Sequence, residues 1–141
     1  GEGSERRSLE ALAHELNVRL LLPGALPHER LPELYVAADV FALPSLHEPW
    51  GVVVNEAAAC GLPLVLSDRV GAAPDLLEDG VNGALVRAGD IGALAAALRR
   101  FADDPAARIA AASASRERMA AWGYPTSVDN FVRAVRETTA R

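Results

Sequence analysis

The sequence lacks lysine and has only one cysteine. All 14 basic residues are arginine, a bias that we attribute to the codon usage of the genome. Because Cys60 stands alone, an internal disulfide and a cysteine-rich metal site are excluded, and a reducing compartment fits. Positive charge is also scarce, since the formal net charge is -5. This balance argues against a nucleic-acid partner.

Long apolar runs, low-complexity tracts and internal repeats are missing as well. No apolar run approaches the ~20 residues that a helix needs to cross a bilayer. The first residues show neither the charged nor the apolar region of a signal peptide. The 141 residues, half of them hydrophobic, suit one globular domain with a core of its own. We therefore expect a cytoplasmic protein.

Short apolar runs alternate with amphipathic segments along the chain. Strands are expected at residues 18–22, 40–44, 62–67 and 82–86. Helices are expected at residues 4–17 with Ser4 as a cap, 31–39, 74–80, 91–104, 105–121, and 128–140 with Ser127 as a cap. This alternation predicts an α/β fold, a Rossmann-like parallel sheet with flanking helices.

The stretch "HEPWGVVVNEAAACGLP", residues 47–63, is ambiguous. Its three valines favour a strand. The alanine-rich part that follows favours a helix, which Gly61 would end in a left-handed conformation two residues before Pro63. We prefer the helix, so that a strand ending at Leu43, a loop and a helix beginning near Gly51 form one unit.

This strand, loop and helix unit predicts a ligand site, because open α/β sheets bind ligands at the carboxyl ends of their strands. Glu48 lies in the loop and Glu56 lies more than one turn into the helix. The free N–H groups of Gly51, Val52 and Val53 at the helix start favour an anion such as a phosphate. One elongated ligand that contacts Glu48, Glu56 and the helix start would fit this arrangement.

The stretch "PSLHEPWGVVVNEAAACGLPLVLSDRVGAAPDLLEDGVNGALV", with "LPGALPHERLPELYVAADVF" before it, resembles a known family. It is similar to the C-terminal nucleotide-sugar-binding domain of the retaining glycosyltransferases of the GT-B fold (family four, group-one type), which include bacterial glycogen synthases. The resemblance covers residues 1–100, and residues 101–141 are read as C-terminal helices. It implies that residues 1–141 are part of a donor-binding domain that lacks its first two strands.

The resemblance implies roles for matched residues. Glu56 would accept hydrogen bonds from the ribose hydroxyls, and Glu48 would serve the transferred sugar as the catalytic carboxylate. The remaining donor-binding residues implied are Trp50, Gly51, Val52, Val53, Gly24 and Leu26. The usual family turn is Glu-Gly-Phe-Gly, whereas this chain has a proline at its second position, which removes one N–H. The implied donor is a UDP- or GDP-sugar, with no metal and no cofactor.

Other interpretations stay open for these and neighbouring residues. Glu48 and Glu56 also suit solvated surface positions, and Trp50 suits a hinge plug beneath a ligand. Structural or turn chemistry competes with ligand contact at His47, Ser67, Asp68, Gly71, Asp75 and Asn82. A dinucleotide-binding dehydrogenase is disfavoured because "GEGSER" has Arg6 where the third glycine belongs.

The resemblance also implies missing parts. The acceptor domain, the first two strands of the donor domain, and the arginine and lysine that grip the donor diphosphate are not in the sequence. We therefore expect the isolated chain to be inactive and to need a companion polypeptide or to self-associate through exposed sheet edges. The alternative is a non-catalytic nucleotide-binding or structural fragment. A lipid-linked acceptor would place the protein at the inner face of the membrane.

Overall fold

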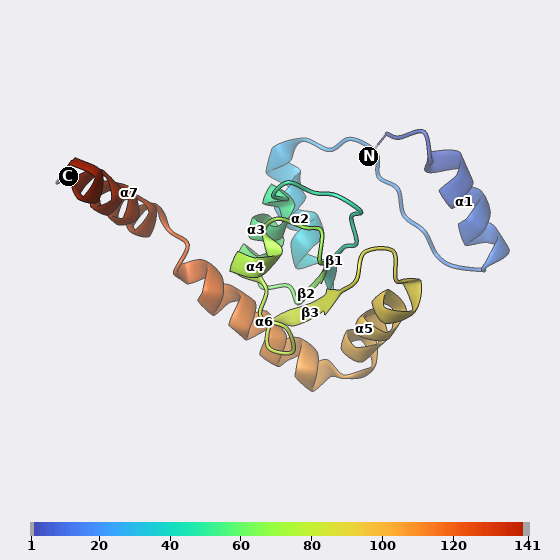
Figure 1. The fold of residues 1–141 in the computed structure, drawn as a ribbon. Coiled ribbons are helices and arrows are strands. Elements are labelled where there is room, and N and C mark those ends of the chain that lie inside the picture. The colour runs from blue at the N-terminus through green and yellow to red at the C-terminus, as the bar shows by residue number, and fades with distance from the viewer. Residues whose placement is uncertain (1, 140–141) are drawn as a thin grey trace. The chain divides into compact units, whose positions relative to one another are not determined.

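The structure, a computed structural model, describes residues 2–139. The chain divides into two compact units, Gly1–Leu34 and Tyr35–Arg141, with α2 spanning the boundary. The elements before the sheet are α1 (Arg6–Glu15), the 3-10 helix η1 (His28–Arg30) and α2 (Leu31–Val36). The second unit continues with β1 (Phe41–Leu43), α3 (Val52–Ala59), β2 (Leu64–Ser67), α4 (Ala73–Leu76), β3 (Gly83–Val86), α5 (Ile91–Asp103), α6 (Pro105–Ala120) and α7 (Tyr124–Thr139) (Figure 1).

The three strands form a parallel sheet in the order β1, β2, β3. Phe41 of β1 lies opposite Leu64 of β2, which lies opposite Gly83 of β3. A helix connects each strand to the next, as parallel pairing requires. The predicted α/β class, with a parallel sheet and flanking helices, is confirmed.

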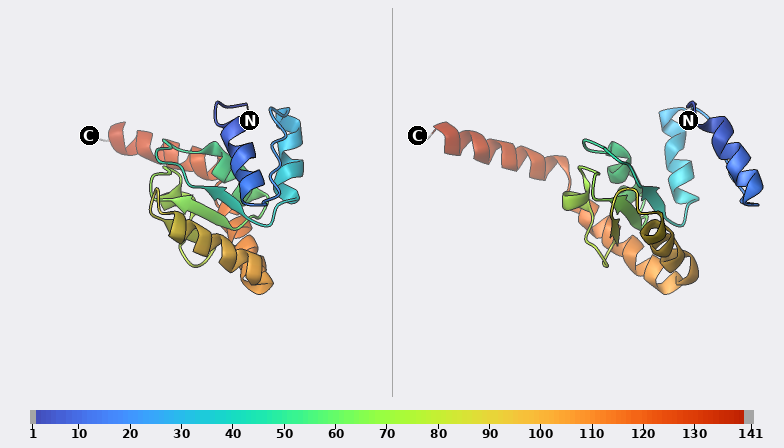
Figure 2. Two further views of the ribbon diagram at one scale, coloured as in Figure 1. Left: turned by 90° about the vertical axis from the view of Figure 1, so that its right-hand side faces the viewer. Right: turned by 45° about the vertical axis from the view of Figure 1, so that its right-hand side comes forward.

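Both faces of the sheet are covered, which explains why the central strand is continuously apolar. Successive residues of a strand point to opposite faces. Leu64 and Leu66 pack in one cluster with α3 and α4, whereas Val65 packs on the other side with Phe101 of α5. The two further views in Figure 2 show α3 and α5 on opposite faces of the sheet.

The ambiguous stretch forms the predicted helix, α3. Val54, Ala57 and Ala58 are buried against the sheet at the spacing of one helix face. The backbone then turns at Gly61, whose φ of +76° lies in the left-handed region. Burial of the alanine-rich face therefore outweighs the strand preference of the valines.

Helix α6 packs at the amino ends of β2 and β3. The buried Ser115 hydroxyl donates to the Leu62 carbonyl at 2.8 Å, and the Asn82 side-chain amide donates to Ser115 Oγ at 3.4 Å and to the Leu76 carbonyl at 2.9 Å. Asn82 is thus a structural residue. The loops that follow the carboxyl ends of the strands lie at the opposite end of the sheet from α6.

Three predictions about local structure are wrong. Residues 18–22 form no strand, because no other described segment pairs with them. Ser4 does not cap α1, whose N-cap is Glu5 without a side-chain hydrogen bond. Ser127 lies inside α7, which already begins at Tyr124, and its hydroxyl donates to the Gly123 carbonyl.

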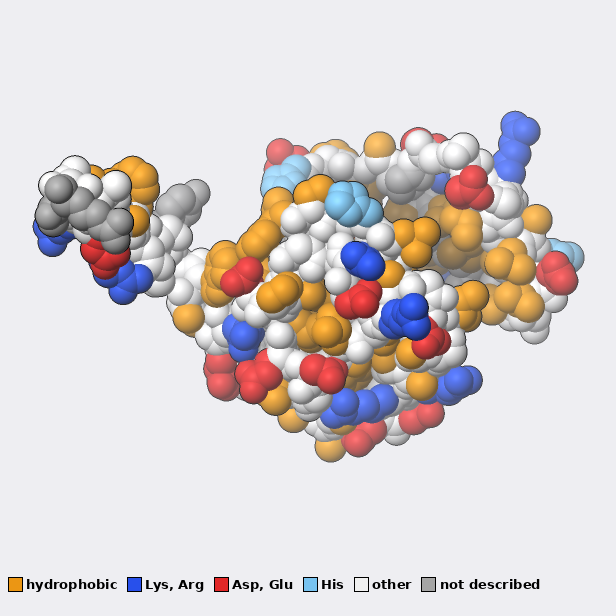
Figure 3. Space-filling view, in the orientation of Figure 1, with side chains coloured by type: hydrophobic (Ala, Val, Ile, Leu, Met, Phe, Trp, Pro, Cys, Tyr) orange, Lys and Arg blue, Asp and Glu red, His pale blue; other side chains and the backbone are white. Residues whose placement is uncertain are grey.

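The surface mixes charged and apolar side chains. On the face of the second unit seen in Figure 3, acidic and basic groups are interspersed with apolar ones. Helix α7 exposes Val128, Phe131, Val132 and Val135. Among residues 2–139, no helix has both the length and the apolar character that crossing a membrane requires.

Candidate functional site

The candidate site lies where the parallel strands end. The loops that follow Leu43, Ser67 and Val86 leave the sheet at the same edge. The first of these loops carries Glu48, and α3, which follows it, carries Glu56. The structure therefore contains the predicted strand, loop and helix unit, with both carboxylates on it.

The loop that carries Glu48 is fastened to its neighbour by backbone hydrogen bonds. The Glu48 N–H donates to the Arg69 carbonyl at 3.0 Å, and the Glu48 carbonyl accepts from the Gly71 N–H at 2.8 Å. The Ala72 N–H donates to the Trp50 carbonyl at 2.9 Å. These bonds extend the parallel pairing beyond the ends of β1 and β2 and fix the backbone at Glu48.

This pairing requires a glycine at position 71. A Cβ atom at Gly71 would overlap the backbone carbonyl of Pro49. The backbones of the two loops therefore approach more closely than any side chain permits. Gly71 is a structural residue that sets the position of the Glu48 loop.

The Glu48 side chain lies beside the start of α3. Gly51, the N-cap of α3, has a φ of +91°, and a Cβ atom there would lie 3.2 Å from Glu48 Cγ. The Glu48 side chain is half-buried, and its carboxylate makes no hydrogen bond or ion pair within residues 2–139. A half-buried carboxylate without an internal partner is available to a ligand.

The first N–H groups of α3 are also available. Val54 donates its N–H to the Gly51 carbonyl at 2.8 Å. Within the described chain, the N–H groups of Gly51, Val52 and Val53 make no hydrogen bond. The positive end of the helix dipole lies at these groups. Glu48 and a potential anion-binding helix start are therefore adjacent.

Glu56 lies on α3, where a tyrosine holds its carboxylate. The Tyr35 hydroxyl donates to Glu56 Oε2 at 2.7 Å. Burial raises the pKa of Tyr35 well above its usual range, and the hydrogen bond to Glu56 raises this pKa further. The phenol therefore stays protonated and keeps donating.

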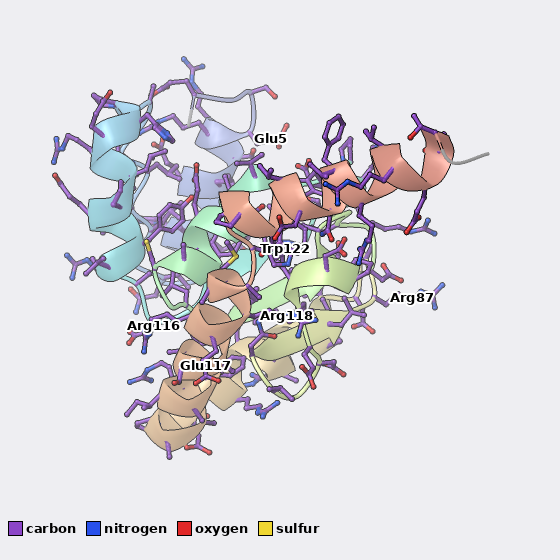
Figure 4. All side chains as sticks on the ribbon, turned by 90° about the vertical axis from the view of Figure 1, so that its left-hand side faces the viewer. Glu5, Arg87, Arg116, Glu117, Arg118 and Trp122 are labelled. Atoms are coloured by element: carbon purple, nitrogen blue, oxygen red, sulfur yellow. The ribbon has the colours of Figure 1, made fainter. Side chains whose placement is uncertain are left out.

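The Trp50 side chain is engaged in packing. Its indole N–H donates to the Asn55 side-chain carbonyl at 3.0 Å, and its ring lies 5.7 Å from the Trp122 ring, centroid to centroid. Figure 4 labels Trp122 at the junction of α6 and α7. These contacts favour a packing role for the Trp50 side chain over contact with a ligand.

The polar residues that end β2 bond to neighbouring loops. The buried Ser67 hydroxyl donates to the Ser45 carbonyl at 2.6 Å, and Asp68 Oδ1 accepts from the Ala88 N–H at 2.9 Å. Turn chemistry accounts for both residues. His47 is exposed, and a cavity of about 270 Å³ near Asp68 has neither Glu48 nor Glu56 in its lining.

Comparison with known protein families shows which family the chain belongs to. The family model described as "Glycosyl transferases group 1" matches residues 1–120. The chain belongs to this glycosyltransferase family. The family assignment made from the two quoted sequence stretches is thus confirmed at the level of the glycosyltransferase family.

Individual relatives agree with this assignment. The D-inositol 3-phosphate glycosyltransferase of Nocardiopsis dassonvillei is 41% identical over 112 residues, which are 79% of this chain and 26% of that protein. The structure of sucrose-phosphate synthase from Thermosynechococcus elongatus matches 99% of this chain and 36% of its own, with a TM-score of 0.81 and 34% identity. Anabaena HepE, solved with UDP-glucose, matches 99% of this chain and 38% of its own, with a TM-score of 0.72 and 28% identity. The chain therefore spans well under half of these relatives.

Two predicted donor-binding residues lie in the first unit. Gly24 has a φ of +79°, and Leu26 is half-buried in the loop before η1. The Arg6 guanidinium donates to the Leu22 carbonyl at 2.9 Å, which ties the start of α1 to the segment that leads into this loop. The role of Gly24 and Leu26 in binding the nucleobase stays a prediction.

Sequence reasoning did not single out Tyr35, whose hydroxyl bonds to Glu56. The sequence signal that could have pointed to it is the presence of a tyrosine within the expected helix 31–39. A tyrosine hydroxyl that is withdrawn from water needs a hydrogen-bond partner. The part of the chain that the structure describes contains no group of three His, Cys, Asp or Glu residues that could hold a metal ion.

Proposed function

We propose that this chain supplies the donor site of a glycosyltransferase that moves a sugar from a UDP- or GDP-sugar with retention of anomeric configuration. The observation that carries the proposal is the arrangement of residues at the carboxyl ends of the strands. There, the Glu48 carboxylate has no internal partner and lies beside the start of α3, which also carries Glu56. The relative HepE, solved with UDP-glucose, supports this choice of donor.

Two groups at the carboxyl ends of the strands suit the nucleotide: the Glu56 carboxylate and the first N–H groups of α3. The Glu56 carboxylate is an acceptor-only group, and the vicinal hydroxyls of a ribose are donors. The N–H groups of Val52 and Val53 point out of the helix start, where they and the helix dipole stabilise a diphosphate. A donor that spans both groups places its sugar toward the loop that carries Glu48.

Glu48 then serves the chemical step. Breaking the bond between the anomeric carbon and the phosphate oxygen leaves positive charge on the sugar and negative charge on the leaving diphosphate. The Glu48 carboxylate stabilises the first charge, and the start of α3 stabilises the second. The sugar-binding part of the site requires no metal ion in this scheme.

To test the proposal, the full-length protein is incubated with a panel of UDP-, GDP- and ADP-linked sugars. Proton NMR follows donor consumption and the anomeric configuration of the sugar first released to water or to an added acceptor. We expect one UDP- or GDP-linked donor to be consumed with its configuration retained. Initial release of the opposite anomer would contradict retention, and nucleotide binding without donor consumption would support a binding module instead.

A further inference from the structure

The hydrogen bond between Tyr35 and Glu56 joins two helices that are distant in the sequence. Tyr35 lies on α2 and Glu56 on α3, 21 residues later, and the hydroxyl reaches Oε2 at 2.7 Å. We propose that Tyr35 is a positioning residue of the donor site, whose hydroxyl holds the Glu56 carboxylate in the orientation that accepts the ribose hydroxyls. This inference rests on the proposed ribose role of Glu56.

The Tyr35 ring is itself held by the core. It packs against the buried cluster of α3, β2 and α4, and its centroid lies 6.1 Å from that of Phe41. A tyrosine side chain has only two main rotatable bonds, so packing of its ring against the core restricts the place of its hydroxyl. The hydroxyl position is thus set by the hydrophobic core.

The Glu56 side chain needs such a support. A glutamate has several rotatable bonds, and α3 fixes only the place of its Cβ atom. Among the described residues, Tyr35 is the hydrogen-bond donor to the Glu56 carboxylate. Without this bond, the carboxylate samples several rotamers, and a ribose must order it on binding.

The bond also leaves room for the ligand. A carboxylate has two oxygens with about four lone-pair sites, and the Tyr35 hydroxyl occupies one site on Oε2. Oε1 and the remaining site on Oε2 can accept the two hydroxyls of a ribose. Because the Glu56 side chain is half-buried, part of it reaches solvent.

A purely structural role for the bond makes different predictions. In a purely structural role, the hydrogen bond would only satisfy the half-buried phenol of Tyr35, and its loss would change stability without changing ligand preference. Positioning through Glu56 requires an effect that depends on the ribose hydroxyls and on the presence of Glu56. Tyr35→Phe separates the two roles, because it keeps the ring and removes only the hydroxyl.

The experiment measures calorimetric affinities of the full-length protein for UDP and GDP, and then for the 2′-deoxy analogue of the tighter binder. The variants are Tyr35→Phe, Glu56→Ala and the double variant, with Ser113→Ala as the control. Ser113 also donates its hydroxyl to a glutamate, Glu117, at 3.1 Å, but on the exposed side of α6.

We expect Tyr35→Phe to weaken binding of the ribonucleotide by roughly three- to tenfold, the loss that one hydrogen bond explains. Binding of the deoxy analogue should change less, so that discrimination between the two ligands shrinks. In the Glu56→Ala background, Tyr35→Phe should have no further effect. Ser113→Ala should leave both affinities as they are.

The two proposals fail in distinguishable ways. If Glu56→Ala abolishes ribose discrimination while Tyr35→Phe only lowers the melting temperature, the positioning role is overturned and the donor site stands. An equal effect of Tyr35→Phe with and without Glu56 would overturn it as well. If neither UDP nor GDP binds, the proposed donor site fails together with this inference.

Discussion

At the scale of single residues, the two glutamates have different surroundings. Glu56 is held by the Tyr35 hydroxyl, whereas the Glu48 carboxylate makes no bond within residues 2–139. A fixed carboxylate suits recognition of a rigid ribose. A carboxylate whose lone pairs are all available suits a sugar on which charge develops during the reaction. These different surroundings favour separate tasks for the two residues in the proposed site.

Replacing Glu48 with glutamine removes the charge and keeps the shape of the side chain. We expect Glu48→Gln to lower kcat by about 10²- to 10³-fold, the usual loss when a charge-stabilising group is removed. Binding of the nucleoside diphosphate should stay nearly unchanged. Steady-state kinetics and calorimetry check both parts. A large loss of nucleotide affinity with normal turnover would mean that the two glutamates have exchanged roles.

Replacing Gly71 with alanine tests whether the close approach of two backbones positions Glu48. The new Cβ would overlap the Pro49 carbonyl, so the loop must shift. We expect a destabilisation of about 1–3 kcal/mol in urea unfolding and a lower kcat. Gly92→Ala is the control, because Gly92 lies in α5 with only Asp90 Oδ1, at 3.5 Å, within range. Equal effects of the two variants would contradict the assigned role of Gly71.

The positions of both glutamates could be predicted from the sequence, whereas the partner of Glu56 could not. Glu48 and Glu56 belong to one continuous motif, whose spacing fixes where they lie on a loop and a helix. The Tyr35 bond depends on how α2 packs against α3, and one sequence carries no direct signal for such packing. For the same reason, the packing of Trp50 against Trp122 was not predicted.

At the scale of elements, the apolar pattern predicts strands correctly where a neighbouring strand is available for pairing. Residues 40–44, 62–67 and 82–86 were expected as strands and contain β1, β2 and β3. Residues 18–22 carry the same pattern and form no strand. A strand depends on hydrogen bonds to a neighbour, and the pattern reports only which side chains avoid water. A strand was therefore predicted correctly only where a described neighbour pairs with it.

Helix α5 depends on its cap. The Asp90 carboxylate accepts from the Ala93 N–H at 2.8 Å. We expect Asp90→Ala to lower the free energy of unfolding by about 1 kcal/mol, as for other N-caps. Asp103→Ala, at the last residue of α5, removes an acidic group from the negative end of the helix and should be neutral or slightly stabilising. Urea unfolding measures both, and equal losses would contradict the capping role.

At the scale of the whole molecule, the chain spans only part of the length of the relatives that it matches. It spans 26% of the inositol phosphate glycosyltransferase and 36% of sucrose-phosphate synthase. In the described residues, β1 pairs on one side only, with β2. An unpaired strand edge presents free N–H and carbonyl groups to other chains. We therefore propose that activity requires polypeptide beyond these 141 residues.

The isolated chain provides a test of this requirement. We expect it to show no sugar transfer and to self-associate as its concentration rises, because the edge of β1 and the apolar side chains of α7 are exposed. Sedimentation equilibrium gives the solution mass, and the donor assay gives the activity. A monodisperse, fully active monomer would contradict this account of the molecule.

The central claim is that the edge containing Glu48 and Glu56 binds a nucleotide sugar through its ribose. The most direct measurement is the calorimetric affinity of the full-length protein and its Glu56→Ala variant for UDP, GDP and their 2′-deoxy analogues. The account predicts that Glu56→Ala weakens binding of the preferred ribonucleotide by about 1.5–3 kcal/mol, the value of a hydrogen bond to a charged group, and that the deoxy analogue then loses its disadvantage. Unchanged affinity together with unchanged ribose discrimination would contradict the claim.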